Sequence, residues 1–81
     1  MTMHAPIAVE SLRVFLLREG IGVGHVHEAT RRAREAGGGD VFPVSALDTI
    51  LEDFELAQRF AEEAMSGEYL DITRAALGAR R

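Results

Sequence analysis

The segment His25-Val26-His27-Glu28 is the one cluster of side chains in this sequence with donor atoms suited to a metal ion. Its spacing argues against such a site. Neighbours two residues apart on a helix point in nearly opposite directions, so His25 and His27 cannot share one ion. His25 and Glu28 can share a face, but two ligands are too few for a metal without help from elsewhere. We therefore interpret both histidines as surface residues and expect no metal.

Alternating glycines at Gly20-Ile21-Gly22-Val23-Gly24 superficially match the glycine-rich loops that bind phosphate. A dinucleotide-binding loop follows a strand within a βαβ unit, and a P-loop ends in Gly-Lys-Ser/Thr. Here a helix is expected before the glycines, no parallel sheet can follow, and the Gly-Lys-Ser/Thr ending is lacking. The run is better explained as a helix cap followed by a tight turn, and we expect no cofactor.

Other side chains capable of catalysis lack the arrangement that catalysis needs. The chain has no cysteine to serve as a nucleophile. Paired carboxylates such as Glu62-Glu63 fall on a long acidic helix, whereas acid–base catalysis needs a pocket that shifts their pKa values. Ser45 is interpreted as a helix cap. We therefore predict that the protein is not an enzyme and has no catalytic residues.

Four helices and one short extended segment are expected to position these side chains. The helices are predicted at residues 6–19, 25–36, 45–66 and 69–77. Pro6 suits a first helical turn, and Gly20 is a natural left-handed residue after the first helix, with Ile21 folding back as in a Schellman cap. Pro43 forces the segment near 41–44 into an extended conformation. The predicted fold is an all-α compact bundle with at most a vestigial pair of strands.

The strongest helical pattern is the apolar stripe of the third helix, which runs for about five turns. Ser45 is expected to cap this helix, with Asp48 three residues on as the capping-box acid. Leu56 and Phe60 lie well away from the stripe. The residues of the stripe are Leu47, Ile50, Leu51, Phe54, Ala57, Ala61 and Met65.

Length and composition place the chain among small folded domains. Its 81 residues, 47% hydrophobic and 27% charged, predict a single helical domain over 1–81. No apolar run is long enough to span a bilayer, and the first residues lack the pattern of a signal peptide. Together with the absence of cysteine, these features lead us to expect a cytoplasmic protein.

Surplus apolar surface favours association with another chain. A domain of this size buries only about 60–65% of its unfolded surface. Val14 and Leu17 lie on the far side of the first helix, and Leu56 and Phe60 lie off the main stripe of the third. We predict that these four residues form a partner interface, most simply in a homodimer. The alternative is that they pack against other elements of the same chain.

A second hypothesis is that the helix over 25–36 binds DNA. The first helix, the glycine turn and this helix have the order of a helix-turn-helix, whose second helix enters the major groove. The extended segment near 41–44 and a helix opening at Ser45 then follow. This order resembles small winged-helix excisionase and MerR-type domains over residues 12–54, and the resemblance implies a DNA-binding regulator. The side chains that would contact nucleic acid are His27, Arg31, Arg32 and Arg34.

The charge distribution weighs against DNA and towards a protein partner. The net charge is −4. Residues 1–39 carry five arginines against four glutamates, and residues 40–81 carry four arginines against nine carboxylates. Glutamates interleaved with the arginines of 25–36 would repel phosphates. We therefore predict a non-enzymatic protein that binds a protein partner in a regulatory, antitoxin-like or assembly role, with no membrane association.

Overall fold

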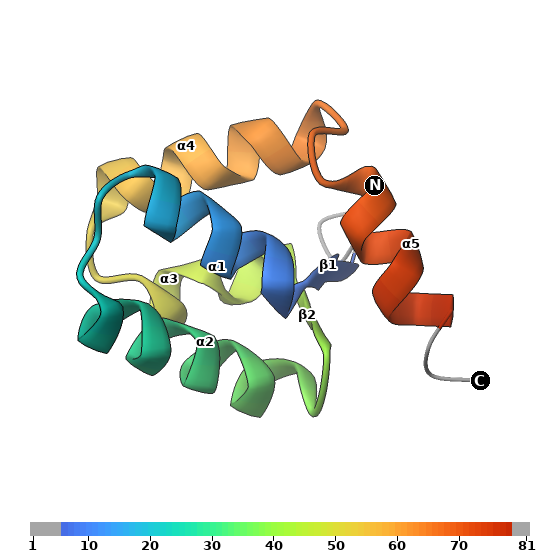
Figure 1. Cartoon of the computed structure of the whole chain (residues 1–81), viewed down its shortest axis with the longest axis horizontal. Coiled ribbons are helices and arrows are strands. Elements are labelled where there is room, and N and C mark those ends of the chain that lie inside the picture. The colour runs from blue at the N-terminus through green and yellow to red at the C-terminus, as the bar shows by residue number, and fades with distance from the viewer. Residues whose placement is uncertain (1–5, 79–81) are drawn as a thin grey trace.

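Two short strands and five α-helices make up the part of the chain described by the computed structural model, residues 6–78 (Figure 1). In chain order the elements are β1 (Pro6–Ala8), α1 (Val9–Arg18), α2 (Val23–Gly37), β2 (Val41–Pro43), a 3₁₀ turn (Val44–Ala46), α3 (Leu47–Ile50), α4 (Phe54–Met65) and α5 (Leu70–Gly78). This mostly helical architecture confirms the predicted all-α bundle with a short extended segment. Within the described residues, no helix is long and apolar enough to cross a membrane.

The strands β1 and β2 pair antiparallel, with Ile7 opposite Phe42. This pairing corrects the predicted start of the first helix, because Pro6 belongs to β1 and α1 begins at Val9. Pro6 lies opposite Pro43 at one end of the ladder, where the missing N–H of proline is tolerated. The partners of β1 are more than thirty residues away in the chain, so no local pattern around Pro6 could reveal them.

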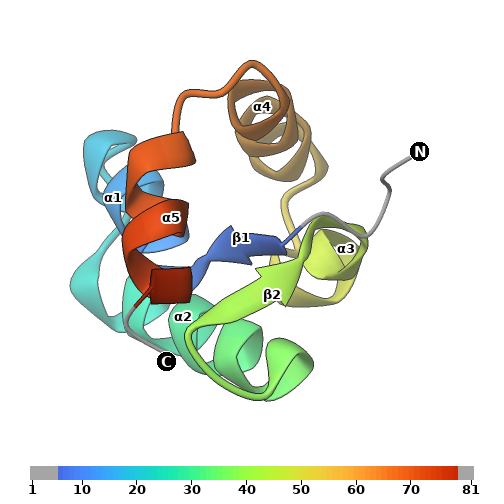
Figure 2. The ribbon, with the colours of Figure 1, turned by 90° about the vertical axis from the view of Figure 1, so that its right-hand side faces the viewer.

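Helix α5 covers the other edge of β1 (Figure 2). The backbone N–H of Ala8 donates a hydrogen bond of 3.2 Å to Oγ1 of Thr73 on α5. Nearby, the Tyr69 hydroxyl donates to a carboxylate oxygen of Glu63 on α4. Burial, followed by the contact with Glu63, raises the pKa of Tyr69 well above its usual value. These two contacts fix α5 against the sheet and against α4.

The turn between α1 and α2 confirms the predicted Schellman cap. Gly20 is left-handed, with φ of +81°. The N–H of Gly20 donates to the carbonyl of Leu17, and the N–H of Ile21 donates to the carbonyl of Leu16, both at 3.1 Å. These bonds satisfy carbonyls at the end of α1, and they leave only residues 19–22 between the two helices.

The prediction of one long helix over 45–66 is wrong, because the helix that begins in this segment ends at Ile50. Leu51 is extended, with φ of −111° and ψ of 124°. Asp53 then caps α4, as its Oδ1 accepts hydrogen bonds from the N–H groups of Glu55 (3.0 Å) and Leu56 (3.2 Å). Aspartate is among the strongest N-cap residues, so a new helix starts here in place of the one predicted from Ser45.

The break changes which side of α4 faces the core. Phe54 and Met65, predicted in the core, are 73% and 80% exposed, while Phe60 is completely buried. The Phe60 ring lies 5.2 Å from the rings of both Phe15 and Tyr69, measured between centroids, and 6.5 Å from that of Phe42. The linker 51–53, extended at Leu51 and Asp53, therefore resets the helical phase and places a different aromatic ring at the centre.

Candidate partner-binding groove

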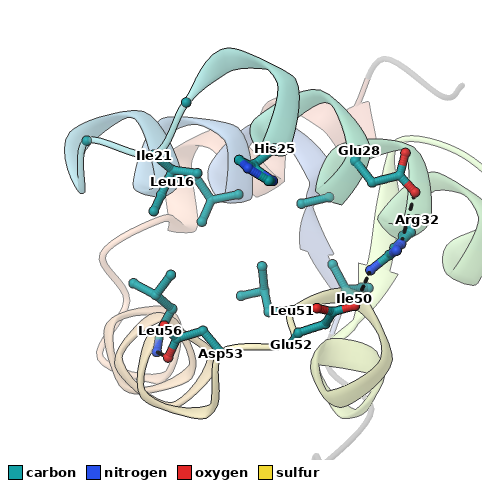
Figure 3. A pocket seen from close by; sticks show the side chains of 13 residues that line it. Leu16, Ile21, His25, Glu28, Arg32, Ile50, Leu51, Glu52, Asp53 and Leu56 are labelled. Atoms are coloured by element: carbon teal, nitrogen blue, oxygen red, sulfur yellow. Dashed lines mark hydrogen bonds and ion pairs between the residues drawn. The ribbon is translucent and has the colours of Figure 1, made fainter.

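A groove of about 550 Å³ lies between the α1–α2 turn, helix α2 and the linker 51–53 (Figure 3). Its volume falls within the range of protein sites that take a small molecule or a few side chains of a partner. The apolar lining is Leu16, Ile21, Ala29, Ile50, Leu51 and Leu56, and the polar lining is His25, Glu28, Arg32, Glu52 and Asp53, with Gly20 and Gly22 at the turn.

Two local features of the sequence build the apolar floor. The Schellman cap folds Ile21 back beside Leu16, and both side chains point into the groove (Figure 3). On the opposite side, the break between α3 and α4 places Leu51 in the extended linker and Leu56 in the first turn of α4, and both line the groove. Ala29 on α2 has a short side chain that leaves the space between these walls open.

The rim of the groove is charged and mostly acidic. Arg32 on α2 pairs with Glu28 on the same helix, with Nε to Oε2 at 3.1 Å, and reaches Glu52 of the linker, with Nη1 to Oε2 at 3.8 Å (Figure 3). The Asp53 carboxylate is the third acid of the rim. With the histidine neutral, three carboxylates against one guanidinium give the rim a net charge of −2.

Glu28 is shared between the two sides of α2. A hydrogen bond from Arg31 is the largest cause that lowers its pKa, and Arg32 lowers it further, against a smaller effect of desolvation. The carboxylate is therefore ionised at neutral pH. Its negative charge holds Arg32 across one end of the groove.

The groove combines apolar side chains with charged ones. The lining contains no serine, threonine, tyrosine or cysteine side chain. In residues 6–78, no group of three or more His, Cys, Asp or Glu side chains is placed to hold a metal ion. What the groove offers is apolar contact area bordered by carboxylates, which suits recognition of an apolar segment that also carries positive charge.

The four residues predicted at a partner interface do not form one surface. Leu56 is half-buried and lines the groove. Phe60 is buried in the core, so for this residue the alternative of packing within the chain is correct. Val14 is half-buried and Leu17 is exposed on α1, and neither belongs to the groove lining.

The residues predicted to contact nucleic acid divide between the two sides of α2. His27, Arg31 and Arg34 are exposed on its outer side, whereas Arg32 belongs to the groove rim. Arg31 already has two carboxylate partners, with Nη1 2.6 Å from Oε2 of Glu35 and a second ion pair to Glu28. These ion pairs neutralise part of the positive charge that DNA binding would use.

Sequence reasoning missed the groove because it missed the linker. The apolar periodicity predicts Leu51 and Phe54 in one continuous stripe, which hides both the break and the surface beside it. The available signal was Asp53, a strong N-cap residue followed by Glu55 in the first turn, where acids favour a helix start. Ile21 was correctly placed at the cap but not connected with Leu56.

Comparisons of the chain with protein-family models, curated proteins and solved structures found no match. The function must therefore be inferred from the geometry of the chain itself. That geometry is a small helical domain whose most distinctive surface is an apolar groove with an acidic rim.

Proposed function

We propose that this chain is a non-enzymatic protein-binding module that takes an apolar segment of a partner into the groove. The observation that carries the proposal is an apolar groove in which two lining residues are each followed in the chain by an exposed large apolar residue. Val23 directly follows the lining residue Gly22, and Phe54 directly follows the lining residue Asp53. Both are among the most exposed large apolar side chains of the described residues, and covering each contributes about 1.5–3 kcal/mol.

The acidic rim supports a preference for a positively charged partner. Complementary charges at the edge of an apolar contact speed association and exclude partners of the wrong sign. Glu55, exposed in the first turn of α4, extends the same field. Regulatory, antitoxin-like and assembly roles all require binding of this kind, and self-association in a homo-oligomer is part of the proposal.

The proposal is tested by nuclear magnetic resonance titration with a synthetic amphipathic helical peptide of about 15 residues that carries leucines and arginines on one face. We expect amide shifts at Ile21, Ala29 and Leu51. Phe54→Ser should weaken the binding, while Met65→Ser, an equally exposed change at the other end of the same helix, should not. Shifts confined to other surfaces, or equal effects of both variants, would contradict the proposal.

DNA binding is the second candidate, favoured by the short connection 19–22 between α1 and α2, which fits a helix-turn-helix. It is weaker because Arg31 is engaged by Glu28 and Glu35. The solution mass with and without a short duplex at low salt separates the two candidates. A salt-sensitive increase in mass that is abolished by changing Arg31, Arg32 and Arg34 to alanine would favour DNA.

A further inference from the structure

We infer that helix α5 of a second copy of this chain occupies the groove, an inference that rests on the protein-binding role proposed above. The contact would join the apolar and cationic side of α5 to the apolar and acidic groove. On α5, the contacting residues would be Leu70, Arg74 and Leu77. In the groove, they would be Leu16, Leu56 and Glu52.

The exposed side of α5 has the pattern that the groove requires. Leu70, Arg74 and Leu77 are spaced at i, i+4 and i+7, so they share one side of the helix. Leu70 is 49% and Leu77 40% exposed, although Thr73 on the neighbouring side of α5, and Tyr69 just before the helix, hold α5 to the domain. Within residues 6–78, Arg74 is exposed and has no ion-pair partner.

The groove is polarised in a way that matches this pattern. Leu16, Ile21 and Leu56 gather at one end, beside the Asp53 carboxylate that caps α4, and the ion pairs of Glu28, Arg32 and Glu52 lie at the other end (Figure 3). A leucine seated at the apolar end of the groove places an arginine one helical turn further along, toward the acidic end. The Glu52 side chain is 89% exposed, so it is free to accept this second cation.

The occupant must be a different molecule. The turn 19–22 and the linker 51–53 lie at one end of the long axis of the domain, and α5 lies at the other (Figure 1). A chain therefore cannot insert its own α5 into its own groove. A contact between unlike surfaces is head-to-tail, which gives rings when the rotation closes and open chains when it does not.

Complementary charge reversals test this contact with the protein alone. In Arg74→Glu the groove stays intact and α5 is altered, while in Glu52→Arg the groove is altered and α5 stays intact. Both side chains are exposed, so either variant should unfold at nearly the same temperature as the wild type. We expect each variant alone to associate at least tenfold more weakly than the wild type, since each places like charges in contact.

The decisive sample is the equimolar mixture of the two variants, measured by light scattering over a range of concentrations. In the mixture, the groove of each variant meets the α5 of the other variant with opposite charge, so we expect association to return toward that of the wild type. Glu62→Arg, which reverses a carboxylate on α4 outside the groove lining, should behave as the wild type.

Three results would overturn the inference: a wild-type chain that stays monomeric up to millimolar concentration, single variants that associate as the wild type does, or a mixture that remains monomeric. If the amphipathic peptide still shifts the groove amides in any of these cases, the protein-binding role stands and only the identity of the occupant is wrong. If the peptide also fails, the proposed function fails with it.

Discussion

The two sides of helix α2 carry the same kinds of charged residue but form different surfaces. On the outer side, Arg31 lies between Glu28 and Glu35, and all three side chains are substantially exposed. On the groove side, Arg32 joins Glu28 to Glu52 of a distant linker, beside apolar side chains. On the outer side the charged residues thus pair with neighbours on the same helix, whereas on the other side they border the groove.

This difference shows why charge alone is a poor guide to a binding surface. Exposed ion pairs between neighbouring residues of a helix contribute only about 0.2–1 kcal/mol and are screened by salt. An apolar floor supplies binding energy by itself, and it lowers the local dielectric around the charges at its rim. The groove side of α2 therefore has more to offer a partner than the arginine-rich outer side.

The largest expected effect is a difference in folding stability between a change in the groove floor and a change on the outer side of α2. Leu51→Ala removes a buried side chain of the groove floor and should lower the free energy of unfolding by about 2–5 kcal/mol. Arg34→Ala, on the outer side, should change it by no more than about 0.5 kcal/mol. Chemical denaturation of both variants measures the contrast, and similar losses would show that the groove floor and the outer side of α2 do not differ as described.

A smaller effect tests how the groove wall is built. Asp53→Ala should cost about 1 kcal/mol, because two N–H groups at the start of α4 lose their acceptor. Asp53→Asn retains the cap and removes one negative charge of the rim, so its stability should stay close to that of the wild type. If alanine and asparagine are equally destabilising in thermal denaturation, the charge and not the cap holds the linker.

Acid titration tests the carboxylate that both sides share. Arg31 is the main cause of the lowered pKa of Glu28, so its contribution to stability is present above the ordinary value of about 4.5 and is lost as the pH falls through the lowered value. Glu28→Gln should therefore have a lower melting temperature than the wild type at pH 7. The difference should vanish at strongly acidic pH, and a difference that grows with acidity would contradict the assignment.

The smallest expected effect concerns DNA. If the ion pairs of Arg31 suppress phosphate binding, the double variant Glu28→Gln, Glu35→Gln should bind a short duplex more strongly than the wild type. One additional phosphate contact makes the slope of log K against log salt more negative by about 0.9. Fluorescence anisotropy across a salt series measures this slope, and an unchanged slope would show that the outer side of α2 lacks a latent DNA surface.

The sequence by itself determined the features that depend on neighbouring residues. The left-handed Gly20 and the return of Ile21 follow from hydrogen bonds within six residues, and the extended conformation before Pro43 follows from a steric clash with the next residue. The helical character of most of the chain follows in the same way from its apolar periodicity. Each of these has a physical cause that is complete within one or two turns of backbone.

Only the tertiary structure decided the features that need distant partners. Pro6 belongs to a strand because residues 41–43 supply its ladder. Phe60 is buried and Phe54 exposed because three other aromatic rings meet Phe60 across the core, and the break near Leu51 lets α4 turn to reach them. The groove exists because that same break lies opposite the cap of α1. Periodicity within one segment carries no information on such contacts, since it cannot tell which of two apolar sides will find neighbours.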